Sequence, residues 1–435
     1  MAEIATQYFT LGETEKAIEL AKQGIKIDNT VADNYIVLYR IFRDTDAAQA
    51  RIWLKKQLIH STYGFIAASE LQLALILAVE PGTEIVLEPE TELVVDESLK
   101  EIIVSIPDDA LETPIREAIN KPTGEITAYD MTHMRELEAR EMGIVDLTGL
   151  KYAVNLNKLD VSNDGGAETP NQISDISVLG SLTNLTSLAL GFNQISDISS
   201  LGVLTKLNIL HLDYNQISDI STLGALTNLT WLGLTGNQIN DISVLGALTN
   251  LTQLALWDNQ ISDISALDVL TNLTFLELGR NQINDISVLG ALTNLTWLAL
   301  WDNQINDISV LGALTNLTWL GLWGNQISDI SPLGALTNLT RLHIGSNQIS
   351  DISATGRLTK LTELGFSWNQ IRDISGLGTL TNLTSLDLWN NKVSDISALA
   401  ALANLTELQL SNNPLSAESK ALVETLRERG VNVSY

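Results

Sequence analysis

The chain has 435 residues, 25 basic and 52 acidic side chains, a formal net charge of −27 and no cysteine. The acidic balance argues against nucleic acid and against a polybasic membrane patch, because both kinds of contact need Lys and Arg. The lack of cysteine excludes disulfides, thiolate metal sites and cysteine nucleophiles. Four histidines argue against a multi-histidine metal site, so no metal or cofactor is expected; they are His60, His133, His211 and His343.

The beginning of the chain lacks the features of a secretory signal. Charges occur from Glu3 onward, and no apolar core of the signal-peptide type follows. The most apolar stretch, residues 65–79, contains Glu70 and Gln72 and is too short and too polar to span a bilayer. We therefore expect a cytoplasmic protein with no membrane partner, or a piece of a longer chain.

The first sixty residues have a helical pattern. Residues 5–29 contain the pattern A-x-x-Y-x-x-x-G-x-x-x-x-A-I-x-x-A, through Tyr8, Gly12, Ala17 and Ala21. This pattern resembles a tetratricopeptide repeat, which implies helical hairpins over residues 1–60. Residues 61–106 predict a helix at 65–79 and two strand-like runs, at 84–87 and 93–95. They are expected to connect the two parts of the chain, without an assigned fold.

A repeat of 22 residues governs the rest of the chain. From Leu182 onward the frame L-x-x-L-x-x-L-x-L-x-x-N-x-I-x-D-I-S recurs without a gap. Two less regular units precede it, and in the second of them an insertion of seven residues delays Asn171. This gives thirteen units, whose Asn column continues through Asn193, Asn215, Asn237, Asn259, Asn281, Asn303, Asn325, Asn347, Asn369, Asn391 and Asn413.

This frame resembles the 22-residue class of leucine-rich repeats, and most closely the bacterial internalin-like proteins, over about residues 108–435. The resemblance implies an α/β repeat solenoid, an arc with parallel strands on its concave face and a helical cap at each end. We expect an N-terminal cap at 107–130 with a helix at 108–120, repeats at 131–415, and a C-terminal cap helix at 416–435. In that last helix Ser416 is the expected N-cap and Gly430 the stop.

Three recurrent motifs look chemical but have structural explanations. The Asn column can bond the backbone of adjacent coils. N-L-T triplets such as that at Asn184 follow from the coil consensus, so glycosylation is not expected. The recurrent Asp, for example Asp285, is expected to accept backbone N–H groups of the turn D-I-S-x-L-G. The alternative, a calcium site, needs six or more oxygens, and no coil supplies them.

The informative residues lie where the frame leaves the sequence free. In residues 188–193 (L-A-L-G-F-N) the two Leu point into the core, so alternation of strand side chains turns 187, 189 and 191 outward onto the concave surface. Residue 192 ends the strand at its rim. The four columns that begin at Ser187, Ala189, Gly191 and Phe192 vary between coils and contain eight of the nine Trp; Trp53 is the exception.

These columns predict an aromatic patch on the concave face of residues 226–357, with a polar rim. Trp297 and Trp301 flank Ala299, and Trp319 and Trp323 flank Gly321, each pair about 13 Å apart along its strand. Two indole walls should therefore stand over a shallow floor of small residues. The candidate partner-binding residues are Trp231, Trp257, Asp258, Phe275, Glu277, Arg280, Trp297, Trp301, Asp302, Trp319, Trp323, Arg341 and His343.

The predicted function is a non-enzymatic scaffold whose concave face binds a protein, because Trp is a frequent interface anchor. A carbohydrate-binding surface on the same aromatic face, or a structural spacer in which neighbouring rings stiffen the array, are the alternatives. No catalytic residues are expected, since the apparent Ser, His and Asp residues are frame positions that face different ways.

Overall fold

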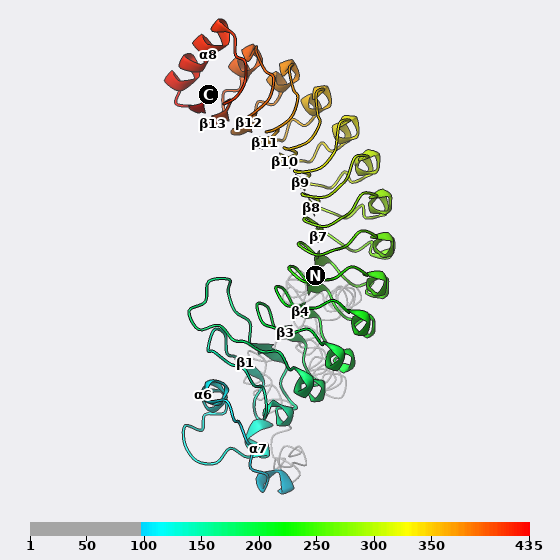
Figure 1. The fold of residues 1–435 in the computed structure, drawn as a ribbon, viewed down its shortest axis with the longest axis vertical. Helices are drawn as coiled ribbons and strands as arrows, with labels where there is room; N and C mark the ends of the chain where they lie inside the picture. Colours follow the sequence, from blue (N-terminus) through cyan, green and yellow to red (C-terminus); the bar gives the residue numbers. More distant parts are fainter. Residues whose placement is uncertain (1–96) are drawn as a thin grey trace, which may run out of the picture. The chain divides into compact units, whose positions relative to one another are not determined.

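The computed structural model describes residues 97–435, which form one curved array of stacked coils (Figure 1). The tetratricopeptide-like segment, most of the predicted connecting segment and Trp53 lie outside these residues. Among the described residues, no helix is long and apolar enough to cross a membrane.

Each coil contributes one strand of three residues, and the strands follow one another in chain order through a fourteen-stranded parallel sheet. The middle residue of each strand from β1 to β13 is a Leu that pairs in register with the Leu of the next coil. Strands of three residues suffice because the partner on each side is a copy of the same coil. The strands are β1 (Glu136–Glu138), β2 (Lys158–Asp160), β3 (Ser187–Ala189), β4 (Ile209–His211), β5 (Trp231–Gly233), β6 (Gln253–Ala255), β7 (Phe275–Glu277), β8 (Trp297–Ala299), β9 (Trp319–Gly321), β10 (Arg341–His343), β11 (Glu363–Gly365), β12 (Ser385–Asp387), β13 (Glu407–Gln409) and β14 (Asn432–Ser434).

Short 3₁₀ helices form the convex edge, opposite the strands (Figure 1). A 3₁₀ helix is narrower than an α-helix and occurs mostly in short pieces. The short S-x-L-G segment on the convex side of most coils is long enough for one such turn. These helices are η2 (Leu150–Tyr152), η3 (Ser177–Ser181), η4 (Ser199–Val203), η5 (Ser221–Ala225), η6 (Ser243–Ala247), η7 (Ser265–Val269), η8 (Ser287–Ala291), η9 (Ser309–Ala313), η10 (Ser331–Ala335), η11 (Ser353–Arg357), η12 (Ser375–Thr379) and η13 (Ser397–Ala401). A further 3₁₀ helix, η1 (Glu97–Lys100), precedes the coils and packs against residues 128–131.

The apolar frame positions form one continuous core along the array. The Leu and Ile at the frame positions are almost completely buried, at 0–2% exposure from Leu179 to Leu399. Each coil buries its apolar side against the two neighbouring coils, so the core grows with the number of repeats. The prediction of a leucine-rich-repeat solenoid with parallel strands is confirmed.

The Asn column joins adjacent coils through their backbones, as predicted. Asn303 is representative: its Oδ1 accepts the backbone N–H of Ile283 at 2.9 Å, while its Nδ2 donates to the carbonyls of Leu278 at 3.0 Å and Leu300 at 3.2 Å. Asn171 occupies the same ladder position, bonded to Ala139 and Ile144, so the seven-residue insertion loops out without breaking the ladder.

Both ends of the array carry helices. Helix α6 (Asp109–Ala118) begins at the N-cap Asp108, whose Oδ2 also accepts the N–H of Val145 at 2.7 Å and so ties the helix to the first coil. Helix α7 (Ala128–Met131) follows it. At the other end, α8 (Ala417–Glu428) has Ser416 as its N-cap, as predicted.

Two features at the ends were not anticipated from sequence. After α8, the chain adds β14 to the sheet beside β13, which covers the last strand edge. At the other end, residues 97–106 already pack against the array: Val104 is buried, and its N–H donates to Ile126 at 2.8 Å. The described end of the predicted connecting segment thus contributes to the core of the repeats.

Candidate functional site: an aromatic concave face

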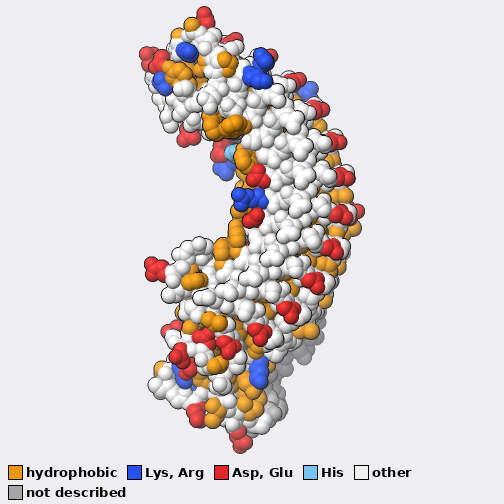
Figure 2. Space-filling view, in the orientation of Figure 1, with side chains coloured by type: hydrophobic (Ala, Val, Ile, Leu, Met, Phe, Trp, Pro, Cys, Tyr) orange, Lys and Arg blue, Asp and Glu red, His pale blue; other side chains and the backbone are white. Residues whose placement is uncertain are grey.

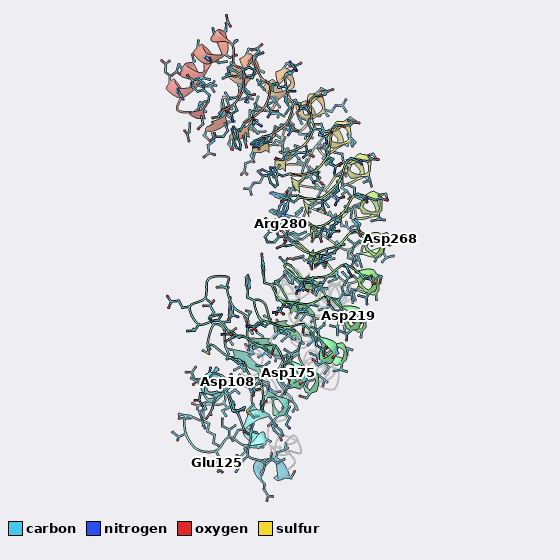
Figure 3. All side chains as sticks on the ribbon, in the orientation of Figure 1. Asp108, Glu125, Asp175, Asp219, Asp268 and Arg280 are labelled. Atoms are coloured by element: carbon cyan, nitrogen blue, oxygen red, sulfur yellow. The ribbon has the colours of Figure 1, made fainter. Side chains whose placement is uncertain are left out.

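The concave face is built from the outward residues of each coil. Strand pairing in register brings residues 22 apart side by side, so that Trp297 lies beside Trp319 and Glu277 beside Ala299. The figures show the result: hydrophobic side chains line the inner edge of the array, with Arg280 among them, while Asp268 lies on the opposite edge (Figures 2 and 3).

The fourth column has an unusual backbone. Every residue at this position from Phe192 to Asn412 has a positive φ, between 48° for Arg280 and 71° for Gly324. This left-handed conformation costs an L-residue about 1–2 kcal/mol, and Gly or Asn is the usual choice. Phe192, Tyr214 and Trp368 occupy it instead. The ring contacts of these side chains at the rim of the concave face offset this backbone cost.

A stack of rings runs along the first column. Phe275 and Trp297 stack with centroids 5.8 Å apart, and Trp297 and Trp319 follow at 4.0 Å with a 5° angle between their planes. His343 continues the row, with its ring 6.1 Å from that of Trp319. The edge of Trp301, from the third column, meets Trp319 at 5.8 Å and 86°.

The predicted trough between two indole walls is wrong. Trp301 and Trp319 approach each other across the face, and their rings cover the small residues between them. Ala299 is completely buried, and a Cβ added at Gly321 would lie only 2.5 Å from the Trp319 ring. The rings fold down because contact with apolar surface and with each other is more favourable than exposure to water.

A second group of rings lies toward the N-terminal coils. His211 packs over Trp231 with centroids 3.9 Å apart, and Phe192 stacks on Tyr214 at 4.2 Å. Tyr214 also meets Trp257 edge-on at 6.3 Å. Burial, reinforced by the nearby charges of Asp258 and Asp213, raises the pKa of Tyr214.

The predicted polar rim is largely paired within the face. Arg280 lies over the Trp257 ring at 5.8 Å, and its Nε is 3.8 Å from Asp302. Burial raises the pKa of Asp302, and the Arg280 charge partly offsets this effect.

Arg341 also forms an ion pair on the face. Its Nε lies 3.0 Å from Glu363, whose other oxygen is 4.0 Å from Nε2 of His343. Burial lowers the pKa of His343 more than the Glu363 charge raises it, which favours the neutral imidazole.

Glu277 and Asp258, two of the predicted rim residues, form no ion pair within the described residues. Burial raises the pKa of Glu277, the charge of Asp213 raises it further, and the nearby indole N–H of Trp297 opposes both without a well-aligned hydrogen bond. The indole nitrogens of Trp257 and Trp297 are buried and have no hydrogen-bond partner among the described residues. Buried donors without partners are uncommon, so these two N–H groups lack the hydrogen-bond acceptors that buried donors normally have.

Three Trp residues of the concave columns are the most exposed of the rings on this face. Trp323, Trp368 and Trp389 have 43%, 49% and 39% of their surface accessible, and the last two meet edge-to-face at 5.2 Å. Trp368 and Trp389 were in the variable columns of the sequence but outside the predicted patch at 226–357. The aromatic face therefore extends at least to β12, beyond that boundary.

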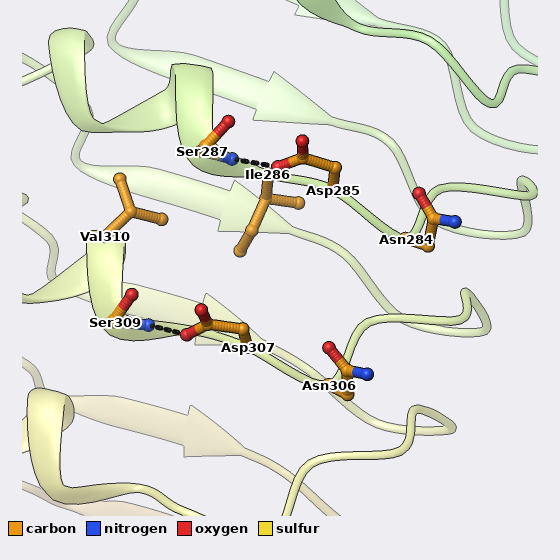
Figure 4. A pocket seen from close by; sticks show the side chains of 8 residues that line it. All are labelled: Asn284, Asp285, Ile286, Ser287, Asn306, Asp307, Ser309 and Val310. Atoms are coloured by element: carbon orange, nitrogen blue, oxygen red, sulfur yellow. Dashed lines mark hydrogen bonds between the residues drawn. The ribbon is translucent and has the colours of Figure 1, made fainter.

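The convex Asp column behaves as a turn motif. Oδ1 of Asp285 accepts the N–H of Ser287 at 2.8 Å, and Asp307 does the same for Ser309 (Figure 4). These bonds lower the pKa values of both carboxyls. A shallow cavity of about 350 Å³ lies between the two turns. Within residues 97–435, no group of three potential metal ligands occurs.

The Asn residues of the N-L-T triplets also have structural partners. Nδ2 of Asn294 donates to the carbonyl of Thr271 in the preceding coil at 2.9 Å, and Asn316 bonds Thr293 in the same way. These contacts repeat along the convex side and support the interpretation of the triplets as part of the coil consensus.

Comparison with known proteins agrees with this architecture. The family described as "Leucine Rich repeats (2 copies)" matches residues 154–203, 183–225, 227–269, 249–291, 293–333, 315–356, 359–401 and 381–422. An internalin from Listeria monocytogenes, InlF, is 37% identical with a TM-score of 0.71, over 77% of this chain and 96% of that protein.

A leucine-rich repeat protein from Leptospira interrogans shares the fold at 22% identity and a TM-score of 0.59, over 71% of this chain and 91% of its own. None of the curated proteins matches the chain. On the repeat matches and the similarity to InlF, this chain belongs to the leucine-rich repeat family, in its internalin-like class.

Proposed function

We propose that the protein is a non-enzymatic scaffold that binds a protein partner on its concave aromatic face, along strands β5–β12. The observation that carries this proposal is the exposure of Trp323, Trp368 and Trp389, each about two-fifths accessible or more. The frame Leu and Ile already fill the core, so stability of the array does not require these rings. Exposed Trp side chains that cluster on one face are typical anchors of protein interfaces.

The surroundings of the rings support the same proposal. Interfaces combine an apolar centre with a polar rim that orients the partner. Here the Trp297–Trp319 stack provides the centre, and the ion pairs Arg280–Asp302 and Arg341–Glu363 lie beside it. Leucine-rich repeat arrays of the internalin type are generally protein-binding scaffolds without catalytic activity, and this chain shares their architecture.

The stacked pair disfavours a carbohydrate at the centre of the face. A sugar ring needs a free indole face to stack on, and the faces that Trp297 and Trp319 turn toward each other, 4.0 Å apart, leave no space for one. The spacer alternative explains the stacked rings through mutual packing. It does not explain why Trp323 and Trp368 leave 43% and 49% of their surface accessible.

The test is affinity capture from the lysate of the source cell with two matched variants. The first, Trp323→Ala/Trp368→Ala/Trp389→Ala, removes the exposed rings but leaves the Trp297–Trp319 stack. The control, Val203→Ala/Val269→Ala, removes exposed apolar side chains from η4 and η7 on the convex edge. Circular dichroism verifies that both variants are folded.

A protein retained by the wild type and the control but lost by the Trp variant supports the proposal. A central anchor should contribute about 2 kcal/mol, or roughly thirtyfold in affinity. Retention by all three proteins contradicts it and moves the site away from these rings. Saturable quenching of Trp fluorescence by members of a glycan array, with no captured protein, would favour the carbohydrate-binding alternative.

A further inference from the structure

The insertion that interrupts the 22-residue frame lies at the rim of the concave face. The ladder positions Met142 and Asn171 stand seven residues further apart than the later ones do. Strand β2 pairs in register with β3, so Asn163 takes the rim position that Phe192 takes in the next coil. The rim loop, residues 164–170, therefore begins directly after the rim residue and ends before the ladder Asn.

The rim loop is fixed to the array at both of its ends. The N–H of Asn171 donates to Oδ1 of Asn163 at 2.6 Å, and Nδ2 of Asn163 donates to the Asn171 carbonyl at 2.9 Å. The N–H of Asp164 donates to Oε1 of Glu141 at 3.0 Å, and the hydroxyl of Thr169 donates to the Glu141 carbonyl at 2.6 Å. A loop held in this way loses less entropy when a partner contacts it.

The rim loop is continuous with the aromatic side chains of the concave face. A Cβ added at Gly165 would lie 3.2 Å from the ring of Phe192, so this ring lies directly against the loop. Phe192 stacks in turn on Tyr214, and Tyr214 meets the edge of Trp257. The loop thus extends the aromatic face at the end that is opposite to the exposed Trp residues.

The tip of the rim loop is open to solvent. Gly166, Glu168 and Pro170 are exposed, and a Cβ added at Gly166 would meet no atom within 4 Å. The N–H groups of Gly166 and Glu168 have no hydrogen-bond acceptor within residues 97–435. In Figure 1 this blue-green loop stands out beside β3 on the strand side of the array. The later coils form the same ladder without a loop, so the array does not need it in order to fold.

The rim loop and the exposed rings lie near opposite ends of the concave face. The loop follows β2, whereas Trp323, Trp368 and Trp389 follow β9, β11 and β12. Seven strand spacings of about 4.8 Å separate β2 from β9, or about 34 Å. A folded domain of about 100 residues has a radius of gyration of about 13 Å, and thus a diameter of about 34 Å. A body of this size reaches both ends, whereas a helix of ten residues is only about 15 Å long.

We propose that the rim loop is a second contact site for the protein partner, and that this partner is a folded domain held between the loop and the exposed Trp residues. This inference rests on the proposed function and adds the size and the folded state of the partner. The tip carries one charged side chain, Glu168, because Asp164 is paired with Arg140. Its small residues let another backbone approach closely, so the loop contacts mainly uncharged polar groups of the domain.

Site-specific photocrosslinking in the lysate of the source cell tests this arrangement with the full chain. The crosslinking side chain is introduced as Glu168→p-benzoylphenylalanine at the loop tip, and as Ser367→p-benzoylphenylalanine beside Trp368, in a column that holds Trp in other coils. The control is Asp268→p-benzoylphenylalanine on the convex edge (Figure 3). One domain of one protein should be crosslinked from positions 168 and 367 and not from 268, as mass spectrometry of the crosslinked peptides would show.

The purified crosslinked domain then measures the contribution of the rim loop. Deletion of residues 164–170 joins Asn163 to Asn171 and creates the Asn-Asn pair that a regular coil has at Asn390 and Asn391, so the variant should fold. Urea unfolding verifies this. The deletion should weaken binding of the domain about tenfold or more.

A second variant keeps the loop and blocks its tip. Gly166→Phe adds a ring where the array has open space, so it should leave the fold intact and weaken binding by preventing close approach. The matched control, Asp268→Phe, adds the same ring on the convex edge and should leave the affinity unchanged.

No crosslink from position 168 above that from 268 would overturn the inference, as would equal affinity of the wild type, the deletion variant and Gly166→Phe. A crosslink from 367 alone would leave the proposed function standing and remove the loop from the site. Crosslinks from neither position would contradict both. A synthetic peptide of the crosslinked residues that binds as tightly as the whole domain would overturn the inference of a folded partner.

Discussion

The indole rings of Trp297 and Trp319 stack face to face, with centroids 4.0 Å apart and planes inclined by 5°. Their strands pair in register, so the 22-residue repeat itself places the two rings in contact. The concave face is therefore partly organised in the unbound protein, and such preorganisation would reduce the entropy lost in the proposed binding.

This stack should stabilise the array measurably. In a double-mutant cycle of Trp297→Ala and Trp319→Ala, we expect a coupling free energy of about 0.5–1.5 kcal/mol beyond the loss of buried area. Urea unfolding of the single and double variants gives the value. The control pair, Trp297→Ala and Trp389→Ala, lies in distant coils and should be additive. Additivity in both pairs would show that the observed stacking has no energetic consequence.

The Asn ladder should contribute more to the free energy of unfolding than exposed polar side chains do. Asn303→Ala leaves the N–H of Ile283 and the carbonyls of Leu278 and Leu300 without their partner, and should destabilise the array by about 1–3 kcal/mol. Amide hydrogen exchange at Ile283 should become faster. Gln304→Ala, at the exposed neighbouring position, should change the stability by less than about 0.5 kcal/mol. Similar effects of the two substitutions would contradict a structural role for the ladder.

The convex Asp residues should make the free energy of unfolding depend on pH in the acidic range. Hydrogen bonds from the Ser backbone lower the pKa values of nine of them below the ordinary 3.8, for example at Asp241, Asp263, Asp285 and Asp307. As the pH falls below the unfolded-state pKa, the unfolded chain binds more protons than the folded one. The folded state then loses this stabilisation until the pH passes below the folded-state pKa values.

A variant with Asn at these four positions isolates the effect, since an Asn side chain can still accept the Ser N–H but does not titrate. The difference in unfolding free energy between wild type and variant should be constant above about pH 5. It should shift against the wild type as the pH falls below 4. A difference that stays constant down to pH 2.5 would show that these carboxylates are not coupled to folding.

The left-handed positions offer a test of strain. Ser346 has a φ of 51°, and its side chain forms no hydrogen bond within the described residues. Ser346→Gly should therefore stabilise the array by about 1 kcal/mol, because Gly adopts this conformation without a steric penalty. The matched control is Ser218→Gly, at an exposed position without a positive φ, and it should be neutral or destabilising. Thermal unfolding distinguishes the two outcomes.

The strained backbone at Trp368 offers a test of the proposed binding site. Its φ is 56°, and Gly occupies the equivalent positions at Gly236 and Gly324. Trp368→Gly should relieve backbone strain, lose the edge contact with Trp389, and leave the free energy of unfolding within about 1 kcal/mol of the wild type. Partner binding should nevertheless fall by tenfold or more if this ring is an anchor. Unchanged binding would remove Trp368 from the site.

Most of the fold could be predicted from the sequence because the period and the apolar positions of the repeat determine the geometry of each coil. The spacing between successive Asn residues sets the coil length, and the alternation around Leu298 and Leu300 sets which residues face inward. Leu188 and Leu190 are likewise buried, as their alternation predicted. The turn role of Asp285 followed from its spacing to Ser287. The extra strand β14 did not follow from the frame, because it lies after the last repeat and is held by its pairing with β13.

The concave site was only partly predictable, and the reason is physical. The sequence by itself determined which residues share the face, since Trp297, Trp301 and Trp319 occupy outward columns of a strict repeat. It could not determine where their rings turn, because an indole on a strand has several rotamers of similar intrinsic energy. Contacts between coils made that choice: Trp301 turned its edge onto Trp319 and covered Ala299, and Glu277 was left without a cation. Column positions follow from the period of the chain, whereas ring orientation and charge pairing depend on neighbours that only the folded array brings together.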